Sequence, residues 1–308
     1  MIEGKEGLLR YQHRAMATMF EIMVAGEDPA FAAGAALAAF EEIDRLEQDL
    51  SRYSANSDIT RVNNLLPHGS VQVGLDAFQC LRLSRQYWEE TAGAFDVTLG
   101  ALVNCWVAKD KSLLHPSPEE IERARERSGM GCLELDETTM TVRVHEFVPL
   151  IDLGAIGKGY AVDRAAELLK EWGVASALVH GGTSSAYAFG DGPQNQGWRV
   201  TLSRPDEPMG ILETLFLKGE GLGGSGIKKG RHIIDPRACL PVEGRHAAWV
   251  LSDSATKSDA LSTACMVMSI EELKKYAAGD SRLWAIIVDG SPGSVLRFGR
   301  AAAPPPPV

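Results

Sequence analysis

The amino-acid sequence predicts an α+β fold, because helical and strand patterns are grouped along the chain and do not alternate. Helical patterns dominate the first half, a run of short strand patterns follows, and helical and strand patterns come last. A doubly wound parallel sheet would require regular strand–helix–strand alternation. The 308 residues can build a sizeable core, and we expect one domain of two lobes over residues 1–300.

The elements of the first half follow from hydrophobic spacing and from capping residues. In order, we expect a strand over 20–26 and helices over 29–53, 74–93 and 115–129. The last of these helices is the best marked. Ser117 is a candidate N-cap, Pro118 suits the first turn, and Glu120 completes a capping box.

The second half contains short apolar runs separated by turn residues, which is typical of strands. Gly173 stands at a C-cap position and closes a helix that we expect to begin at Tyr160. The other expected elements are a hairpin over 133–144, strands over 176–182, 185–190, 198–203 and 213–219, helices over 254–268 and 270–279, and a strand over 283–290. The tail over 301–308, AAAPPPPV, is expected to be disordered.

Composition argues against two classes of partner. The formal net charge is -10, whereas a non-specific nucleic-acid binder needs a basic face. No window approaches the roughly 18 apolar residues that a membrane span requires. The start of the chain also lacks the apolar run of a signal peptide, so we expect a cytoplasmic protein. An anionic small ligand stays possible, since a local site can oppose the overall field.

One glycine-rich segment, GLGGSG over 221–226, matches the GxGxxG pattern of dinucleotide-binding folds. That fingerprint requires a helix directly after the glycines. The residues that follow, IKKGRHIIDP, include Gly230 and Pro236 and show no helical period. We therefore expect a flexible loop between strands here, and no Rossmann site.

A second glycine-rich stretch, DLGAIGKGYAVD over 152–163, precedes the helix expected from Tyr160. Its three glycines allow a ligand to approach the backbone closely or the backbone to adopt a positive φ. The helix N-terminus and Lys158 would add positive charge. These features fit a phosphate cradle, and they fit a plain strand–turn–helix connection equally well.

The segment SDALSTA places Asp259, Ser262 and Thr263 at positions i, i+3 and i+4, which share one face of a helix. Carboxylate and hydroxyl oxygens are ligands that magnesium accepts, with water and phosphate oxygens in the other positions. An ordinary polar helix face would show the same spacing. The small apolar neighbours predict a buried helix, in which polar groups need partners, and this favours the metal site without establishing it.

The segment HIIDP, over 232–236, places His232 at a strand end before an Asp-Pro turn. A surface histidine is one interpretation. A residue that contacts a ligand or shuttles a proton is the other, and the residue pattern leaves both open.

Six segments stand in a characteristic order: MATMFEI, LSRYSANSDITRVN, GAFDVTLGALVNCW, DLGAIGKGYAVDRAAELL, HIIDPRACLPV and SDALSTACMVM. Together they resemble the FAD:protein FMN transferase family, the ApbE-like flavin transferases. The resemblance extends from about Met16 to Met268. Each segment alone is a weak signal, whereas six in the right order are a strong one.

The resemblance implies an α+β fold with mixed or antiparallel sheet and packed helices, and FAD in a cleft between two lobes. Family members use magnesium to split the FAD pyrophosphate, attach FMN by a phosphoester to a threonine or serine of a target flavoprotein, and release AMP. We therefore expect a flavin transferase whose partners are FAD and an acceptor flavoprotein. The alternatives are an FAD pyrophosphatase, which gives FMN and AMP, and a non-catalytic flavin-binding protein.

The resemblance also implies roles for residues at matching positions. His232 and Asp259 would be catalytic, and His232 would assist proton transfer. The FAD contacts would be Met16, Tyr53, Ala94, Phe95, Asp96, Asp152, Lys158, His232 and Ile234. The magnesium ligands would be the backbone oxygen of Ala155 and the side chains of Asp259, Ser262 and Thr263.

Two departures from the family pattern lie near the expected FAD site. Ala17 stands where the family's Met-Gly-Thr has glycine. The segment GGTSSAYAFG, over 181–190, lacks the asparagine and arginine of the family's GGNIR-like segment. The second departure motivates the pyrophosphatase alternative. Most relatives are also exported and lipid-anchored.

Overall fold

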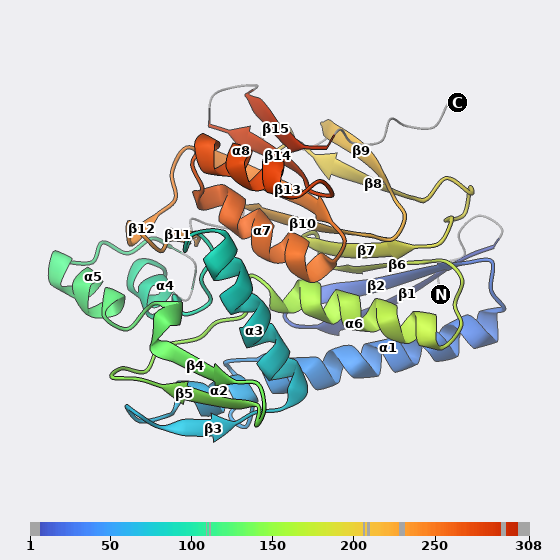
Figure 1. Ribbon diagram of the computed structural model, residues 1–308. Coiled ribbons are helices and arrows are strands. Elements are labelled where there is room, and N and C mark those ends of the chain that lie inside the picture. Colours follow the sequence, from blue (N-terminus) through green and yellow to red (C-terminus); the bar gives the residue numbers. More distant parts are fainter. Residues whose placement is uncertain are drawn as a thin grey trace.

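The computed structural model describes residues 7–108, 110, 112–205, 207, 210–227, 232–290 and 294–300. Within these residues, grouped helices and strands build the α+β fold that the sequence predicts (Figure 1). The expected tail over 301–308 lies outside the described residues. The division into two lobes stays a prediction.

The largest sheet among the described residues has 8 strands in the order β1-β2-β6-β7-β10-β13-β14-β15. All neighbouring strands are antiparallel. They are β1 (Leu8–Ala15), β2 (Thr18–Ala25), β6 (Ala177–Gly181), β7 (Ser185–Phe189), β10 (Glu220–Gly226), β13 (Arg245–Ser252), β14 (Trp284–Asp289) and β15 (Val295–Gly299). In β2, Phe20, Ile22 and Val24 are fully buried, and this two-residue period directs them to one face.

Helices pack against one face of this sheet (Figure 1). They are α1 (Pro29–Leu50), α6 (Gly157–Glu171), α7 (Ala255–Val267) and α8 (Ile270–Gly279). Helix α6 contacts β6 and β7, α7 contacts β10 and β13, and α1 contacts both β1 and α6. The apolar sides of α1, α6 and α7 and the facing strands form the main core, whose burial drives folding.

A hairpin supplies a second, smaller core on the sheet. Its strands are β8 (Trp198–Ser203) and β9 (Ile211–Leu217). Trp198 and Leu217 pack in this core with Trp284 of β14.

Residues 51–150 form a second region, at the lower left of Figure 1. Its elements are α2 (Asp58–Asn63), β3 (Ser70–Gln72), α3 (Leu75–Glu90), α4 (Gly100–Trp106), α5 (Pro118–Arg125), a short 3-10 turn (Met130–Cys132), β4 (Leu133–Asp136) and β5 (Thr141–Val144). The strands β3, β5 and β4 pair in that order. Helix α3 contacts both α1 and α7 and so connects this region to the large sheet. The short strands β11 (Ile234–Asp235) and β12 (Leu240–Pro241) pair with each other.

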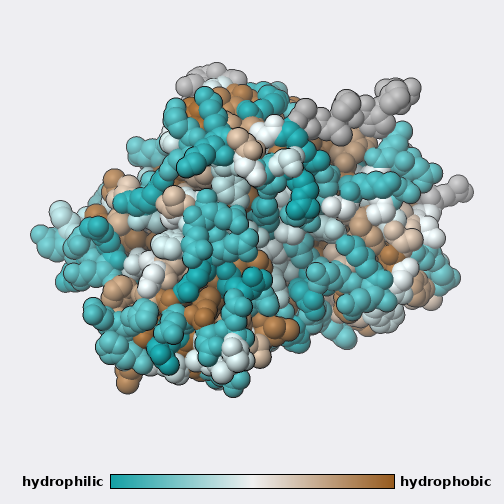
Figure 2. All heavy atoms as spheres, viewed as in Figure 1, coloured by the Kyte–Doolittle hydropathy of each residue, from teal (hydrophilic) through white to brown (hydrophobic). Residues whose placement is uncertain are grey.

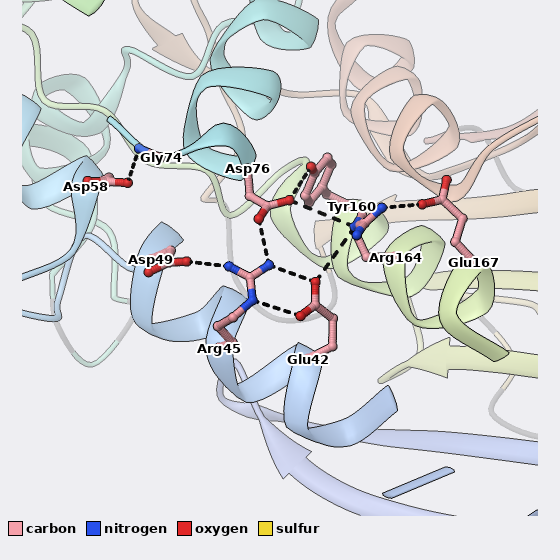
Figure 3. Close-up of polar contacts among 9 residues, drawn as sticks. All are labelled: Glu42, Arg45, Asp49, Asp58, Gly74, Asp76, Tyr160, Arg164 and Glu167. Atoms are coloured by element: carbon pink, nitrogen blue, oxygen red, sulfur yellow. Dashed lines mark hydrogen bonds and ion pairs between the residues drawn. The ribbon is translucent and has the colours of Figure 1, made fainter. Parts of the chain in front are cut away.

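A polar network joins α1, α3 and the first turn of α6 (Figure 3). Asp76, in the first turn of α3, is at its centre. Its carboxylate accepts a hydrogen bond of 2.7 Å from the hydroxyl of Tyr160 and pairs at 2.6 Å with Arg45 of α1. Arg45 also pairs at 2.7 Å with Glu42. Charge-assisted bonds of this kind hold the start of α6 in place relative to the two other helices.

Most sequence-based elements are confirmed, including the capping box at Ser117 and the hairpin over 133–144. Gly173 has a φ of 92°, as a C-cap glycine should. The expectation of a flexible loop at GLGGSG is wrong, because this segment is β10, in the interior of the large sheet. The expected start of α6 at Tyr160 is also wrong, since the helix begins at Gly157.

Hydrophilic side chains cover most of the face that Figure 2 shows. Across the described part of the chain, no helix is both long and apolar enough to cross a membrane. The five cysteines are free thiols, and four of them are buried.

Candidate functional site

The candidate site is centred on the contact between the start of α6 and the middle of α7. Gly159 lies in that contact, where the space leaves no room for a side chain. A Cβ atom there would stand 2.4 Å from the carbonyl oxygen of Ala255 and 2.8 Å from Cβ of Asp259. Glycine therefore permits α6 and α7 to approach closely, which brings Asp259 against the first turn of α6.

Asp259 is a buried carboxylate with several donors around it. Its side chain is in α7 and the residue is only 2% exposed. Oδ2 accepts a hydrogen bond of 3.0 Å from the backbone amide of Gly159 and lies 3.5 Å from Nζ of Lys158. Burial raises the pKa of Asp259, and Lys158, the Gly159 amide and Ser185 each oppose that rise. A cation that binds this carboxylate would therefore compete with a proton at acid pH.

Three hydroxyl groups form a cluster that reaches the backbone oxygen of Asp259. Ser225 of β10 has its Oγ 2.8 Å from Oγ of Ser262 and 2.9 Å from Oγ1 of Thr263. Ser262 is fully buried, and its hydroxyl donates to the backbone oxygen of Asp259 at 2.8 Å. Thr263 is only partly buried, so its oxygen is more accessible than that of Ser262. The i, i+3, i+4 face predicted from the sequence is therefore present.

The turn before α6 supplies a backbone oxygen. In a regular helical turn the amide of Gly159 would donate to the carbonyl of Ala155, but here it donates to Asp259. Among the described residues, no hydrogen bond to the Ala155 oxygen is found. That half-buried carbonyl thus keeps its lone pairs for another partner.

Lys158 extends along the same turn. Its ammonium donates to the carbonyl of Gly154 at 2.8 Å. The side chain is 23% exposed, so solvent or a ligand can reach it. Gly154, Gly157 and Gly159 do not have positive φ, so the positive-φ role considered for these glycines is wrong, and the close approach of a ligand stays a prediction.

Asp152 and Tyr53 are connected through Arg52. Oδ2 of Asp152 lies 2.7 Å from Nε of Arg52, and Oδ1 accepts from the Gly154 amide at 2.9 Å. The Arg52 guanidinium lies 4.5 Å from the centre of the Tyr53 ring. Tyr53 is 80% exposed, which suits a ring that stacks on a ligand and not a core residue.

The turn at Met16 is a two-residue connection between β1 and β2. Met16 has a φ of 48° and Ala17 a φ of 56°, and Ala15 pairs with Thr18. Positive φ at both central residues is the geometry of a type I′ hairpin. The Met16 side chain packs against the main core.

The remaining residues expected to contact FAD have packing or turn roles in the structure. Ala94 and Phe95 are buried in the main core. Asp96 accepts hydrogen bonds from the backbone amide and hydroxyl of Thr98, and burial raises its pKa. Ile234, in β11, packs in a small cluster with α4 and α5. His232 is exposed and precedes β11 by two residues.

The donors around Asp259 fit magnesium by their chemistry. One carboxylate, one threonine hydroxyl and one backbone carbonyl are hard oxygen ligands, and magnesium bound by few protein groups keeps water or phosphate oxygens. The described residues contain no cluster of three or more His, Cys, Asp or Glu side chains that could hold a metal.

A groove of about 820 Å³ is lined by residues of β11, β12 and neighbouring segments. Its lining includes Trp106, Leu114, Arg237, Leu240 and Met266. None of the residues that the sequence assigns to FAD or magnesium lines it.

Four residues around the site were missed by sequence reasoning: Arg52, Asp163, Ser185 and Ser225. Arg52 could have been found, because it stands next to Tyr53 in the quoted SRYS segment. Asp163 accepts from the amides of Ala255 and Thr256, both at 2.8 Å, and so anchors the start of α7. Ser225 and Ser185 carried no local signal, since their partners are on other elements.

The chain is similar to known proteins in sequence and in fold. The model of the ApbE family matches residues 16–287. The FAD:protein FMN transferase of Salmonella typhimurium is 27% identical, over 85% of this chain and 79% of its own. That of Escherichia coli K12 is 26% identical, over 76% of this chain and 71% of its own.

Solved structures show the same fold. An ApbE protein from Thermotoga maritima superposes with a TM-score of 0.84 at 26% identity, and covers 94% of this chain and 97% of its own. The flavinyl transferase ApbE of Pseudomonas stutzeri, in its apo form, superposes with a TM-score of 0.80 at 24% identity and covers 97% of each chain. The resemblance seen in the sequence is therefore confirmed.

Proposed function

This chain belongs to the ApbE family, and from that premise we propose that it is a magnesium-dependent FAD:protein FMN transferase. A serine or threonine hydroxyl of an acceptor flavoprotein would attack the FMN phosphorus of FAD. A new oxygen–phosphorus bond forms, and the bond from that phosphorus to the bridging oxygen breaks. AMP leaves with the bridging oxygen, and the hydroxyl proton passes to a base. The names of the relatives support the transfer of FMN to protein.

The observation that carries this proposal is the set of oxygens around Asp259. Its buried carboxylate faces the first turn of α6, and the Thr263 hydroxyl is on the same face of α7. With the Ala155 carbonyl, these groups would hold the magnesium ion. Bound there, the ion would neutralise the charge that develops on the pyrophosphate and orient the leaving phosphate. Ser262 would be a further ligand of the ion, and its hydroxyl bond to the backbone oxygen of Asp259 would hold it in place.

The neighbouring residues would bind and orient FAD. The partly exposed Lys158 ammonium would contact pyrophosphate oxygens, and the N-terminus of α6 adds partial positive charge. Tyr53 would stack on the flavin or adenine ring, and Arg52 would hold both Tyr53 and Asp152 in position. Met16, Ala94, Phe95, Asp96 and Ile234 would shape the rest of the FAD site through backbone contacts and packing.

His232 is the residue to which we assign assistance in proton transfer. His232 is exposed, so an acceptor protein can reach it, and an imidazole nitrogen can act as the general base for the acceptor hydroxyl. Its replacement by glutamine would lower transfer without weakening magnesium binding.

The test is chromatography of FAD after incubation with the protein and magnesium, with and without an acceptor that carries a Ser/Thr target segment. AMP that forms only with acceptor, together with a fluorescent acceptor, is the expected result. AMP and free FMN without acceptor would instead identify an FAD pyrophosphatase. Bound FAD with no AMP in either tube would contradict catalysis and favour a flavin-binding protein. The Asp259→Ala variant is the matched control for metal-dependent turnover.

A further inference from the structure

The segment GLGGSG has a steric function that the dinucleotide-binding motif does not describe. Gly221 and Gly223 are on the face of β10 that meets α7. A Cβ at Gly221 would stand 2.2 Å from the amide nitrogen of Ala255, and one at Gly223 would stand 2.1 Å from the carbonyl oxygen of Ser258. The two glycines therefore let the backbone of α7 rest directly on the strand.

Ser225 is the next residue on that same face, because side chains alternate along a strand. Its side chain reaches α7 one turn beyond the glycine contacts. There its Oγ lies 2.8 Å from Oγ of Ser262 and 2.9 Å from Oγ1 of Thr263. Ser225 is thus the strand residue that joins the two hydroxyls next to Asp259.

The number of hydroxyl protons decides which group donates in each hydrogen bond of this cluster. The Ser262 hydroxyl donates its only proton to the backbone oxygen of Asp259, at 2.8 Å. Ser262 must therefore accept at its contact with Ser225, and Ser225 donates there. Because Ser225 donates its only hydroxyl proton there, its oxygen must accept a hydrogen bond from the Thr263 hydroxyl. The bonds run from Thr263 to Ser225, then to Ser262, and end at the Asp259 carbonyl.

From this direction we infer that Ser225 is a positioning residue that turns the lone pairs of the Thr263 oxygen toward the cation site. The inference rests on the proposed function, since it takes the cation site from there. Thr263 donates its proton to Ser225, so both of its lone pairs stay available to a cation. Without Ser225, the Thr263 hydroxyl is free to donate to the carbonyl four residues earlier, that of Asp259, as helical threonines commonly do. Its oxygen would then turn away from the site.

The experiment measures Mn²⁺ binding by calorimetry in the absence of FAD, so that turnover plays no part. Ser225→Ala is compared with the wild-type protein and with Ser252→Ala. Ser252 is a matched control, because it forms the same kind of strand-to-helix hydroxyl pair, with Ser258 at 2.8 Å. Both variants lose a hydroxyl bond to α7, but only Ser225 contacts Thr263.

We expect Ser225→Ala to weaken Mn²⁺ binding by about tenfold, as is usual when a group that orients a metal ligand is removed. Ser252→Ala should bind like the wild type. In a Thr263→Ala background the Ser225→Ala change should have no further effect on the Kd. If Ser225→Ala is too unstable to measure, Ser225→Cys, which keeps the size but is a weak donor, takes its place.

If Ser225→Ala and Ser252→Ala have equal Kd values while the wild type binds Mn²⁺, the role of Ser225 is overturned. The proposed function would not be affected by that result. An additive loss in the Thr263→Ala background would do the same, because Ser225 would then act without Thr263. A wild-type protein that binds no Mn²⁺ would overturn the cation site of the proposed function as well.

Discussion

The backbone amide of Gly159 donates a hydrogen bond of 3.0 Å to Oδ2 of Asp259, across the contact between α6 and α7. This bond depends on the missing side chain at Gly159, because a Cβ there would stand 2.4 Å from the Ala255 carbonyl oxygen. It also withdraws the amide from the Ala155 carbonyl. One glycine therefore brings a buried carboxylate to the turn and leaves the Ala155 carbonyl of that turn without a helical donor.

Replacing Asp259 by alanine should remove AMP release. The site would lose its carboxylate, and even groups that only orient a metal ligand cost 10–100-fold in affinity, so we expect a fall of at least about 100-fold. FAD binding should weaken as well. AMP release and FAD affinity are measured by chromatography and fluorescence, with a melting curve as the folding control. Unchanged AMP release would overturn the assignment of the cation to Asp259.

Replacing Gly159 by alanine should destabilise the protein by about 3 kcal/mol, because the new methyl group meets backbone atoms that cannot rotate away. Gly157→Ala is the matched control in the same turn. A Cβ at Gly157 would stand 3.7 Å from Cβ of Leu153, an ordinary contact. The free energy of unfolding of Gly157→Ala should rise by up to about 1 kcal/mol, since alanine favours the helix. Urea unfolding measures both, and equal stabilities would contradict the steric role of Gly159.

Ala17→Gly should stabilise the protein by about 0.5–1 kcal/mol. Ala17 has a φ of 56°, and the strain of a Cβ in this region exceeds the entropy that glycine gains on unfolding. Ala33→Gly is the opposite control, because Ala33 is an exposed residue inside α1. This change should lower the free energy of unfolding by about 1 kcal/mol. Melting temperatures that shift in the same direction for both variants would refute the strain at Ala17.

Asp163 should make stability depend on pH between about 4 and 6. Burial raises the pKa of Asp163 to about 6, against an ordinary value of 3.8. The folded state therefore keeps a proton that the unfolded state releases. The contribution to stability is present below pH 4 and is lost as the pH rises through 6, by up to about 3 kcal/mol.

Asp163→Asn removes this group and is the comparison that isolates it. The stability difference between the wild type and Asp163→Asn should shrink as the pH rises from 4 to 7. Denaturant unfolding at four or five pH values measures that difference. A difference that grows over this range would show that the carboxylate is favoured in the folded state by the amides of Ala255 and Thr256.

The sequence alone was sufficient for the features that depend on local pattern. The capping box at Ser117, the hairpin over 133–144 and the face shared by Asp259, Ser262 and Thr263 each follow from spacing along one segment. Six ordered segments were also sufficient for the family, since their order does not depend on knowing the contacts. The fold class followed from the grouping of helices and strands.

Only the tertiary structure decided which groups meet. GLGGSG has the residue pattern of a loop, because its glycines have no side chain to show burial. It is nevertheless a strand inside the sheet, since α7 needs that absent side-chain volume. Ser225 reaches Thr263 across 38 positions of sequence, and Asp259 reaches Gly159 across 100. Such contacts leave no periodic trace in the chain, because they arise from how packed helices and strands cross and not from spacing within one element.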